Sequence, residues 1–309
     1  MKLLYVLFNI CIIPTIALAQ TRTFSDSLPS GNNYNKAAFR LWYPNDAKSI
    51  AGVIVLVPGS NDDGRNMVED TLWQNLARRH GFALLGCYLS DHPHKNMDIE
   101  HYVKVKDGSG QALLDMLSIF AKQSGHTELN YAPLVLWGFS AGGEFNYEFV
   151  CWKPERVIAF IVNKGGIYYT ALASEEAQNV PGIFFIGEND LELRTNVVKG
   201  IFTINRRFGA LWAFVEESGV GHEIGISQEM AIIFFDDIID RRLPEKLQPN
   251  SNKITLQALL ESDGLIGDLK TCKYENYATW LLKDYATSWL VNVKVANVWL
   301  SITNGRPLK

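Results

Sequence analysis

The sequence Gly-Phe-Ser-Ala-Gly-Gly at residues 138–143 contains a serine that could act as a nucleophile. It follows the apolar run 133–137, which is typical of a buried strand. A serine at a sharp turn from a strand into a helix is pushed out of the sheet, and its hydroxyl is free to attack a substrate. Small neighbours are needed because this turn brings the backbone close to itself. Ser140 is therefore a candidate nucleophile, and its alternative role is that of a helix N-cap.

A serine hydroxyl needs an adjacent base, and the base needs a third group that orients it. Of the six histidines only His222 follows Ser140, and it lies in a glycine-rich loop. Asp190 lies between the two, in a turn that ends an apolar run. The order Ser140, Asp190, His222 is the one expected when the serine lies on a strand-to-helix turn. We therefore predict a catalytic triad, with Glu188 and Glu192 as alternative acids.

Two backbone amides are candidates for stabilising the oxyanion of a tetrahedral intermediate. The β-branched apolar run 51–57 predicts a strand buried on both faces, and it ends at Pro58-Gly59. The loop after such a strand and the residue after the nucleophile each supply one N–H group to the oxyanion. We therefore assign the oxyanion hole to the amides of Ser60 and Ala141. Pro58-Gly59 is also compatible with a plain tight turn.

Strands and helices alternate along most of the chain. Such alternation predicts a mainly parallel sheet with helices on both faces, and ligands of these sheets bind at the carboxyl ends of the strands. The triad and oxyanion loops all follow predicted strands. The expected strands are 51–57, 82–89, 133–137, 157–162, 183–186 and 211–215, and the expected helices are 72–80, 109–122, one ending at 152, 195–208 and 228–241.

The two ends of the chain differ from this core. Residues 1–19 have a basic start, a short apolar stretch and Ala-Leu-Ala at the end, which predicts a signal peptide cut after Ala19. A membrane anchor is the alternative, but the apolar run is short for one. We expect a core at 20–245, a linker around 244–253, and a C-terminal helical extension at 246–309. Three tryptophans in the extension predict that it packs on the core.

The chain has 309 residues, of which 47% are hydrophobic and 20% are charged. This length and composition fit one large domain. The net charge of −4 gives no indication of nucleic-acid binding or of attraction to acidic membranes. After signal cleavage the chain is expected to be secreted or periplasmic and not membrane-bound, in an oxidising compartment. Cys87, Cys151 and Cys272 remain, so at most one disulfide can form, and burial as small apolar side chains is the favoured interpretation.

Histidines and acids cluster at 91–101, where Asp91, His92, His94 and His101 lie with Asp98 and Glu100. Their spacing matches no defined zinc motif. The segment is a polar connection between a strand and a helix, so we interpret it as a rim loop that faces the substrate. We predict neither a metal nor a cofactor.

The turn at 138–143, together with Trp-Lys-Pro-Glu-Arg-Val at 152–157 and Asn-Lys-Gly-Gly at 163–166, resembles the secreted α/β-hydrolases related to polyhydroxybutyrate depolymerases and feruloyl or acetylxylan esterases. The similarity covers roughly residues 50–240. It implies an α/β-hydrolase fold and hydrolysis of carboxylic esters by a Ser-His-Asp triad without a cofactor. Many members of that group carry His-Gly before the oxyanion loop, where this chain has Pro58-Gly59. This departure means that the substrate of a particular relative does not carry over to this chain.

The sequence thus predicts a secreted serine esterase acting on a small or polymeric ester. A serine peptidase on the same fold is one alternative, although many such peptidases carry a propeller domain for which this chain has no room. A non-catalytic binding protein is another, but it would not need the serine, acid, histidine and small turn residues together. The sequence indicates neither a particular ester nor an oligomeric state.

Overall fold

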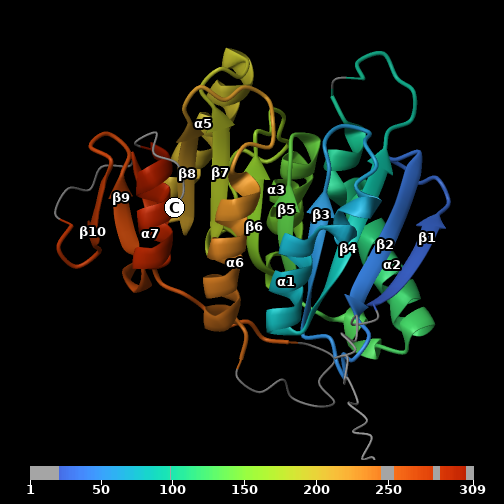
Figure 1. Ribbon diagram of the computed structural model, residues 1–309. Coiled ribbons are helices and arrows are strands. Elements are labelled where there is room, and N and C mark those ends of the chain that lie inside the picture. The colour runs from blue at the N-terminus through green and yellow to red at the C-terminus, as the bar shows by residue number, and fades with distance from the viewer. Residues whose placement is uncertain (1–20, 98, 245–253, 281–285, 304–309) are drawn as a thin grey trace, which may run out of the picture.

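A computed structural model describes residues 21–97, 99–244, 254–280 and 286–303 (Figure 1). Within these residues, eight strands form one sheet in the order β1-β2-β4-β3-β5-β6-β7-β8. Strands β3 to β8 are parallel, and β1 and β2 run antiparallel to their neighbours. The strands are β1 Thr21–Leu28, β2 Lys36–Pro44, β3 Gly52–Val57, β4 Phe82–Ser90, β5 Leu134–Gly138, β6 Val157–Asn163, β7 Gly182–Gly187 and β8 Trp212–Glu217. This topology is that of an α/β-hydrolase and confirms the predicted fold class.

Helices cover both faces of the sheet (Figure 1). Helices α1 and α6 pack on one face, and α2, α3 and α5 pack on the other. Two glycines with positive φ, Gly81 at 67° and Gly125 at 82°, end α1 and α2. The helices are α1 Thr71–His80, α2 Ser109–Ser124, α3 Ala141–Trp152, the short α4 Glu175–Gln178, α5 Glu192–Arg206 and α6 Ser227–Arg242.

The central strands are continuous apolar runs because both of their faces are buried. In β3, Val53, Val55 and Val57 enter the core on one side of the sheet, whereas Ile54 and Leu56 enter the core on the other side. Side chains of a strand alternate between faces, so a strand covered on both sides needs an apolar residue at every position. These two cores fix the strand ends that carry the candidate site.

The C-terminal extension is not helical throughout, so that part of the prediction is wrong. Its described residues form a three-stranded antiparallel sheet in the order β10-β9-β11, followed by one helix. Strands of four residues are too short for apolar periodicity to distinguish them from helical turns. The elements are β9 Leu265–Asp268, β10 Lys273–Asn276, β11 Thr287–Leu290 and α7 Val293–Thr303.

The extension covers the β8 edge of the main sheet. The Phe214 N–H group of β8 donates to Ser288 Oγ at 2.9 Å, and Trp299 Nε1 donates to the Phe214 carbonyl oxygen at 2.8 Å. Trp289 and Trp299 are both buried. An uncovered edge strand exposes unpaired backbone groups that can recruit another chain. Side chains of the extension satisfy these groups at the centre of β8.

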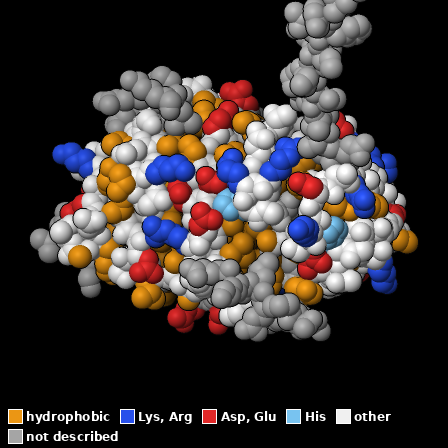
Figure 2. Space-filling model, turned by 60° about the horizontal axis from the view of Figure 1, so that its bottom comes forward, with side chains coloured by type: hydrophobic (Ala, Val, Ile, Leu, Met, Phe, Trp, Pro, Cys, Tyr) orange, Lys and Arg blue, Asp and Glu red, His pale blue; other side chains and the backbone are white. Residues whose placement is uncertain are grey.

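Some predictions fall outside the described residues, namely the signal peptide 1–19 and the greater part of the linker 244–253. Among the residues that the structure describes, no helix is long and apolar enough to span a membrane. Basic and acidic side chains are interspersed on the face shown in Figure 2. Cys87 is buried, Cys151 and Cys272 are half-buried, and all three are free thiols.

Candidate active site

Ser140 lies at the turn between β5 and α3 in a strained backbone conformation. Its φ is 54° and its ψ is −124°, in a region that residues other than glycine rarely adopt. The Ser140 N–H group donates to the Asn163 carbonyl oxygen at 2.7 Å, which ties the turn to the end of β6. A Cβ atom at Gly142 would overlap the carbonyl oxygens of Val57 and Pro58. The glycine therefore allows the close backbone approach that holds the turn.

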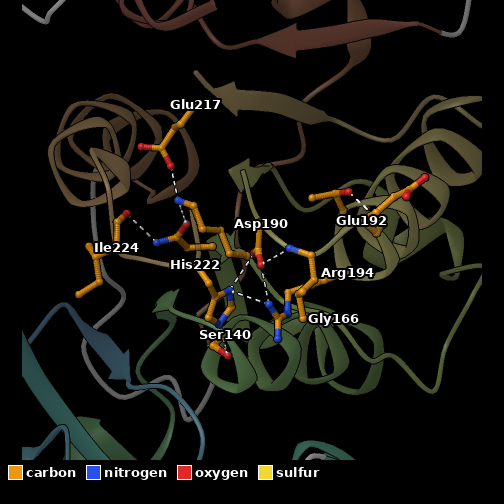
Figure 3. Close-up of polar contacts among 12 residues, drawn as sticks. Ser140, Gly166, Asp190, Glu192, Arg194, Glu217, His222 and Ile224 are labelled. Carbon is orange, nitrogen blue, oxygen red and sulfur yellow. Dashed lines mark hydrogen bonds and ion pairs between the residues drawn. The ribbon is translucent and has the colours of Figure 1, made fainter. Parts of the chain in front are cut away.

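The structure brings Ser140, His222 and Asp190 together at the carboxyl ends of the strands (Figure 3). His222 Nε2 lies 3.0 Å from Ser140 Oγ, and His222 Nδ1 lies 2.8 Å from Asp190 Oδ2. The Asp190 side chain is 2% exposed, whereas the His222 side chain is 30% exposed. The imidazole is therefore oriented by a buried carboxylate on one side and faces the serine hydroxyl on the other.

Asp190 is held by more than the histidine. Its Oδ1 accepts hydrogen bonds from Arg194 Nη1 at 2.5 Å and from the Leu191 N–H group at 2.7 Å. Burial on its own would raise the pKa of Asp190, but the hydrogen bonds from His222, Leu191 and Arg194 outweigh burial and lower this pKa below its ordinary value. Asp190 is therefore ionised at neutral pH.

The two alternative acids occupy other places. Glu188 Oε2 accepts from Ser218 Oγ and from the Gly219 N–H group, each at 2.7 Å, so it holds the start of the loop that carries His222. Glu192 is exposed at the first turn of α5. Asp190 is thus the acid that the structure places against the imidazole.

The loop that carries the Ser60 amide and the turn that carries the Ala141 amide approach each other at the nucleophile. A Cβ atom at Gly59 would lie 3.7 Å from Ser140 Cβ, so the loop after β3 passes next to the nucleophile. Among the described residues, neither the Ser60 nor the Ala141 N–H group donates a hydrogen bond to another protein group. The Ala141 amide also belongs to the first turn of α3, where the helix dipole favours negative charge.

The histidine-rich segment 91–101 is organised around one buried acid. Asp91 accepts hydrogen bonds from the N–H groups of His101 at 2.8 Å and Tyr102 at 3.0 Å, and it pairs with His94 Nε2 at 2.9 Å. Within the part of the chain that the structure describes, no group of three histidine, cysteine or acidic side chains could hold a metal ion. The segment is tied to the oxyanion loop, since the Asp91 N–H group donates to Asn61 Oδ1 at 2.8 Å.

Sequence reasoning missed Arg194, which Figure 3 shows beside the triad, and a buried cluster of Asn163, Lys164 and Glu217. The spacing could have indicated Arg194, because it follows Asp190 by four residues and directly precedes the predicted helix 195–208, so a single turn of the chain can bring the two side chains together. Lys164 and Glu217 are 53 residues apart, and only the folded sheet shows that they pair.

No protein-family model and no curated protein matches the chain. Among solved structures, it is similar to a protein of Klebsiella pneumoniae assigned as a dienelactone hydrolase, with 18% identity, a TM-score of 0.47, and coverage of 68% of this chain and 90% of that one. It is also similar to a ferulic acid esterase, with 11% identity, a TM-score of 0.49, and coverage of 71% and 97%. An S-formylglutathione hydrolase of Staphylococcus aureus gives 10% identity, a TM-score of 0.49, and coverage of 72% and 97%.

Proposed function

We propose that this protein is a secreted serine hydrolase that cleaves carboxylic esters through an acyl-enzyme intermediate. One observation carries the proposal. A serine held at a positive φ lies 3.0 Å from a histidine nitrogen, and the other nitrogen of that histidine lies 2.8 Å from a buried aspartate. These are the distances and the chain of contacts that activate a serine hydroxyl.

Acylation begins with Ser140 Oγ attacking the ester carbonyl carbon while His222 Nε2 takes the hydroxyl proton. For this step the neutral imidazole carries its proton on Nδ1, which donates to Asp190 and leaves Nε2 free to accept. The carbonyl oxygen becomes an oxyanion that the Ser60 and Ala141 amides stabilise, with each donor contributing about 3 kcal/mol. His222 then gives its proton to the leaving alkoxide, and an alcohol departs.

Deacylation repeats the sequence with water as the nucleophile. His222 takes a proton from the water as its oxygen attacks the acyl carbon, and the same two amides stabilise the second oxyanion. The C–O bond to Ser140 breaks, the serine oxygen recovers its proton from His222, and a carboxylic acid is released. The cycle needs no group beyond the side chains and amides named here.

Hydrolysis of a short-chain p-nitrophenyl ester by the purified protein, beside a Ser140→Ala variant, tests the proposal. We expect turnover by the wild-type protein and a loss of at least about 10⁴-fold in the variant, with unchanged thermal unfolding. Equal rates in the two proteins would reject the triad. Faster cleavage of an aminoacyl amide than of the matching ester would instead identify a peptidase, and absence of turnover with both would favour a binding protein.

Secretion is a separate part of the proposal and needs its own experiment. The support is the signal-peptide pattern of residues 1–19. The N-terminal sequence of the protein recovered from a secreting host is expected to begin at Gln20. Recovery of the intact chain from the membrane fraction would point to an anchor instead.

A further inference from the structure

Three polar residues are buried beside the triad without belonging to it. Asn163 ends β6, Lys164 follows it, and Glu217 ends β8; none is more than 2% exposed. Lys164 Nζ donates to the Glu217 carboxylate and to Asn163 Oδ1, the latter at 3.1 Å. A buried ion pair loses its hydration and is often no more stabilising than apolar residues of the same volume. Stability is therefore a weak reason for this cluster to exist.

The backbone at Lys164 adds a second cost. Its φ is 55°, in the left-handed region, where a residue other than glycine is strained. The conformation is held by a hydrogen bond from the Lys164 N–H group to the Phe185 carbonyl oxygen at 3.0 Å. Strain of this kind persists where the surrounding structure imposes it, and such positions cluster at functional sites.

The cluster binds the far half of the segment 218–226, which we call the histidine loop because it carries His222. Asn163 Nδ2 donates to the Ile224 carbonyl oxygen at 2.9 Å and to Ser227 Oγ at 2.6 Å. Glu217 Oε1 accepts from the Ile226 N–H group at 2.7 Å. Between these two contacts, Gly225 has a φ of 59°, and a Cβ atom there would overlap the Glu217 carboxylate. Three consecutive backbone positions of the loop are thus fitted to the cluster.

The near half of the histidine loop is held independently by the turn that carries the acid. Glu188 accepts from the Gly219 N–H group at 2.7 Å, and the Asn189 N–H group donates to the Val220 carbonyl oxygen at 2.9 Å. His222 therefore lies between two anchored stretches. The near half is anchored to the turn that carries Asp190. The far half is anchored to Asn163, whose carbonyl oxygen accepts a hydrogen bond from the Ser140 N–H group.

We propose that Lys164 and Glu217 are positioning residues that hold His222 Nε2 in line with Ser140 Oγ, through Asn163 and the far half of the histidine loop. This inference rests on the esterase function proposed above. Glu217 must keep its charge to be paired by Lys164, and Lys164 in turn holds the Asn163 amide in the orientation that donates to the loop. Displacing a catalytic group by about 1 Å can cost about 100-fold in rate.

The test compares Lys164→Met, Glu217→Gln and the double variant. Each single variant leaves one buried charge without its partner, so we expect kcat to fall about 10- to 100-fold with KM within about twofold of wild type. The double variant removes both charges and keeps an amide oxygen that can accept the Ile226 N–H group. It is therefore expected to recover part of the loss in kcat but not the wild-type value, because Asn163 Oδ1 no longer accepts a hydrogen bond from Lys164. If Lys164→Met does not fold, Ser227→Ala, which removes only one acceptor of Asn163, is expected to lower kcat a few-fold.

Arg206 and Glu261 provide a matched ion pair away from the triad, with side chains 2% and 27% exposed. Arg206→Met is expected to lower the melting temperature and leave kcat per folded molecule unchanged. An equal loss of kcat in Arg206→Met, or a wild-type kcat in folded Glu217→Gln, would overturn the positioning role.

A readout that needs no turnover separates this inference from the esterase proposal. ¹⁵N NMR of the histidine rings is expected to show one Nδ1-protonated tautomer for His222 in wild type and a mixture in Glu217→Gln. A single unchanged tautomer in that variant would contradict the positioning role, even if no ester hydrolysis were found in any of the proteins.

Discussion

Polar groups are satisfied by opposite means at the carboxyl ends of the central strands, around Ser140, and along the β8 edge of the sheet. Around Ser140, the backbone is strained at Ser140 and Lys164, and charges are buried in pairs. At the β8 edge, the backbone groups of Phe214 are satisfied by Ser288 and Trp299 inside an apolar cluster. The first arrangement keeps the backbone strained. The second pairs the backbone groups of Phe214 and buries a large apolar surface around them.

This difference indicates which region serves reactivity and which serves stability. Strain and buried charge reduce the net stability of a fold, so they persist where a side chain must be held in one place. Buried tryptophans contribute to stability through apolar area and need only a partner for their N–H groups. Substitutions of the triad residues themselves should therefore change the rate with little effect on unfolding, and substitutions at the β8 edge should do the reverse.

The largest expected effect is that of Asp190→Asn. The amide keeps the shape of the side chain but cannot stabilise the imidazolium or select the Nδ1-protonated tautomer, so kcat should fall about 10⁴-fold. Steady-state hydrolysis of a p-nitrophenyl ester measures this loss. Glu192→Gln, at the exposed start of the same helix, is the control and should keep the wild-type rate. A loss of less than about tenfold in Asp190→Asn would remove the aspartate from the mechanism.

The second prediction tests the opposite region. Trp299→Ala removes a fully buried ring and leaves the Phe214 carbonyl oxygen with only the long hydrogen bond from Ser288 Oγ at 3.4 Å, so it should lower the free energy of unfolding by about 3–5 kcal/mol. Activity per folded molecule should not change, because the extension packs on β8 and not on the triad. Urea unfolding and ester hydrolysis measure the two effects. Phe208, 65% exposed, provides the control, since Phe208→Ala should change stability by about 0.5 kcal/mol or less.

The predictable part of the fold consists of elements whose burial fixes their pattern. The runs that form β3, β5 and β7 are apolar at every position because both faces are covered, so the sequence reveals them. Strand β1 is largely polar, and its sequence gives no such pattern. It forms because it pairs along its whole length with β2, and such long-range pairing is not visible in either segment alone.

The candidate site divides in the same way. Ser140, Asp190 and His222 could be named from the sequence because each follows a predicted strand and because their order along the chain is informative. Lys164 and Glu217 also lie just after predicted strands, but nothing in the sequence indicates that they pair until the sheet places β6 and β8 with only β7 between them. The proposed role of Lys164 and Glu217 depends on the ion pair between them, and the sequence does not show which residues are in contact.

The third prediction concerns the second partner of Asp190. Arg194→Gln removes the guanidinium that holds Oδ1, so the carboxylate can rotate away from His222, and we expect kcat to fall roughly tenfold. Arg194→Lys keeps the charge but loses the planar fork, and it should recover only part of the loss. Rates at saturating ester for the two variants and wild type measure the effect. A full recovery in Arg194→Lys would show that charge alone matters at this position.

The smallest expected effect is a pH dependence of stability. The pKa of Asp190 is lower in the folded protein than its ordinary value of 3.8, so the folded state favours the ionised carboxylate. The stabilisation is therefore fully present above about pH 5 and is lost as the pH falls through the lowered pKa. The difference in unfolding free energy between wild type and Asp190→Asn should shrink as the pH falls below about 4. Solvent reaches His222 and screens this pair, so the change should be smaller than the effect of Trp299→Ala. A difference that grows as the pH falls below about 4 would mean that the hydrogen bonds to Asp190 do not favour its charge.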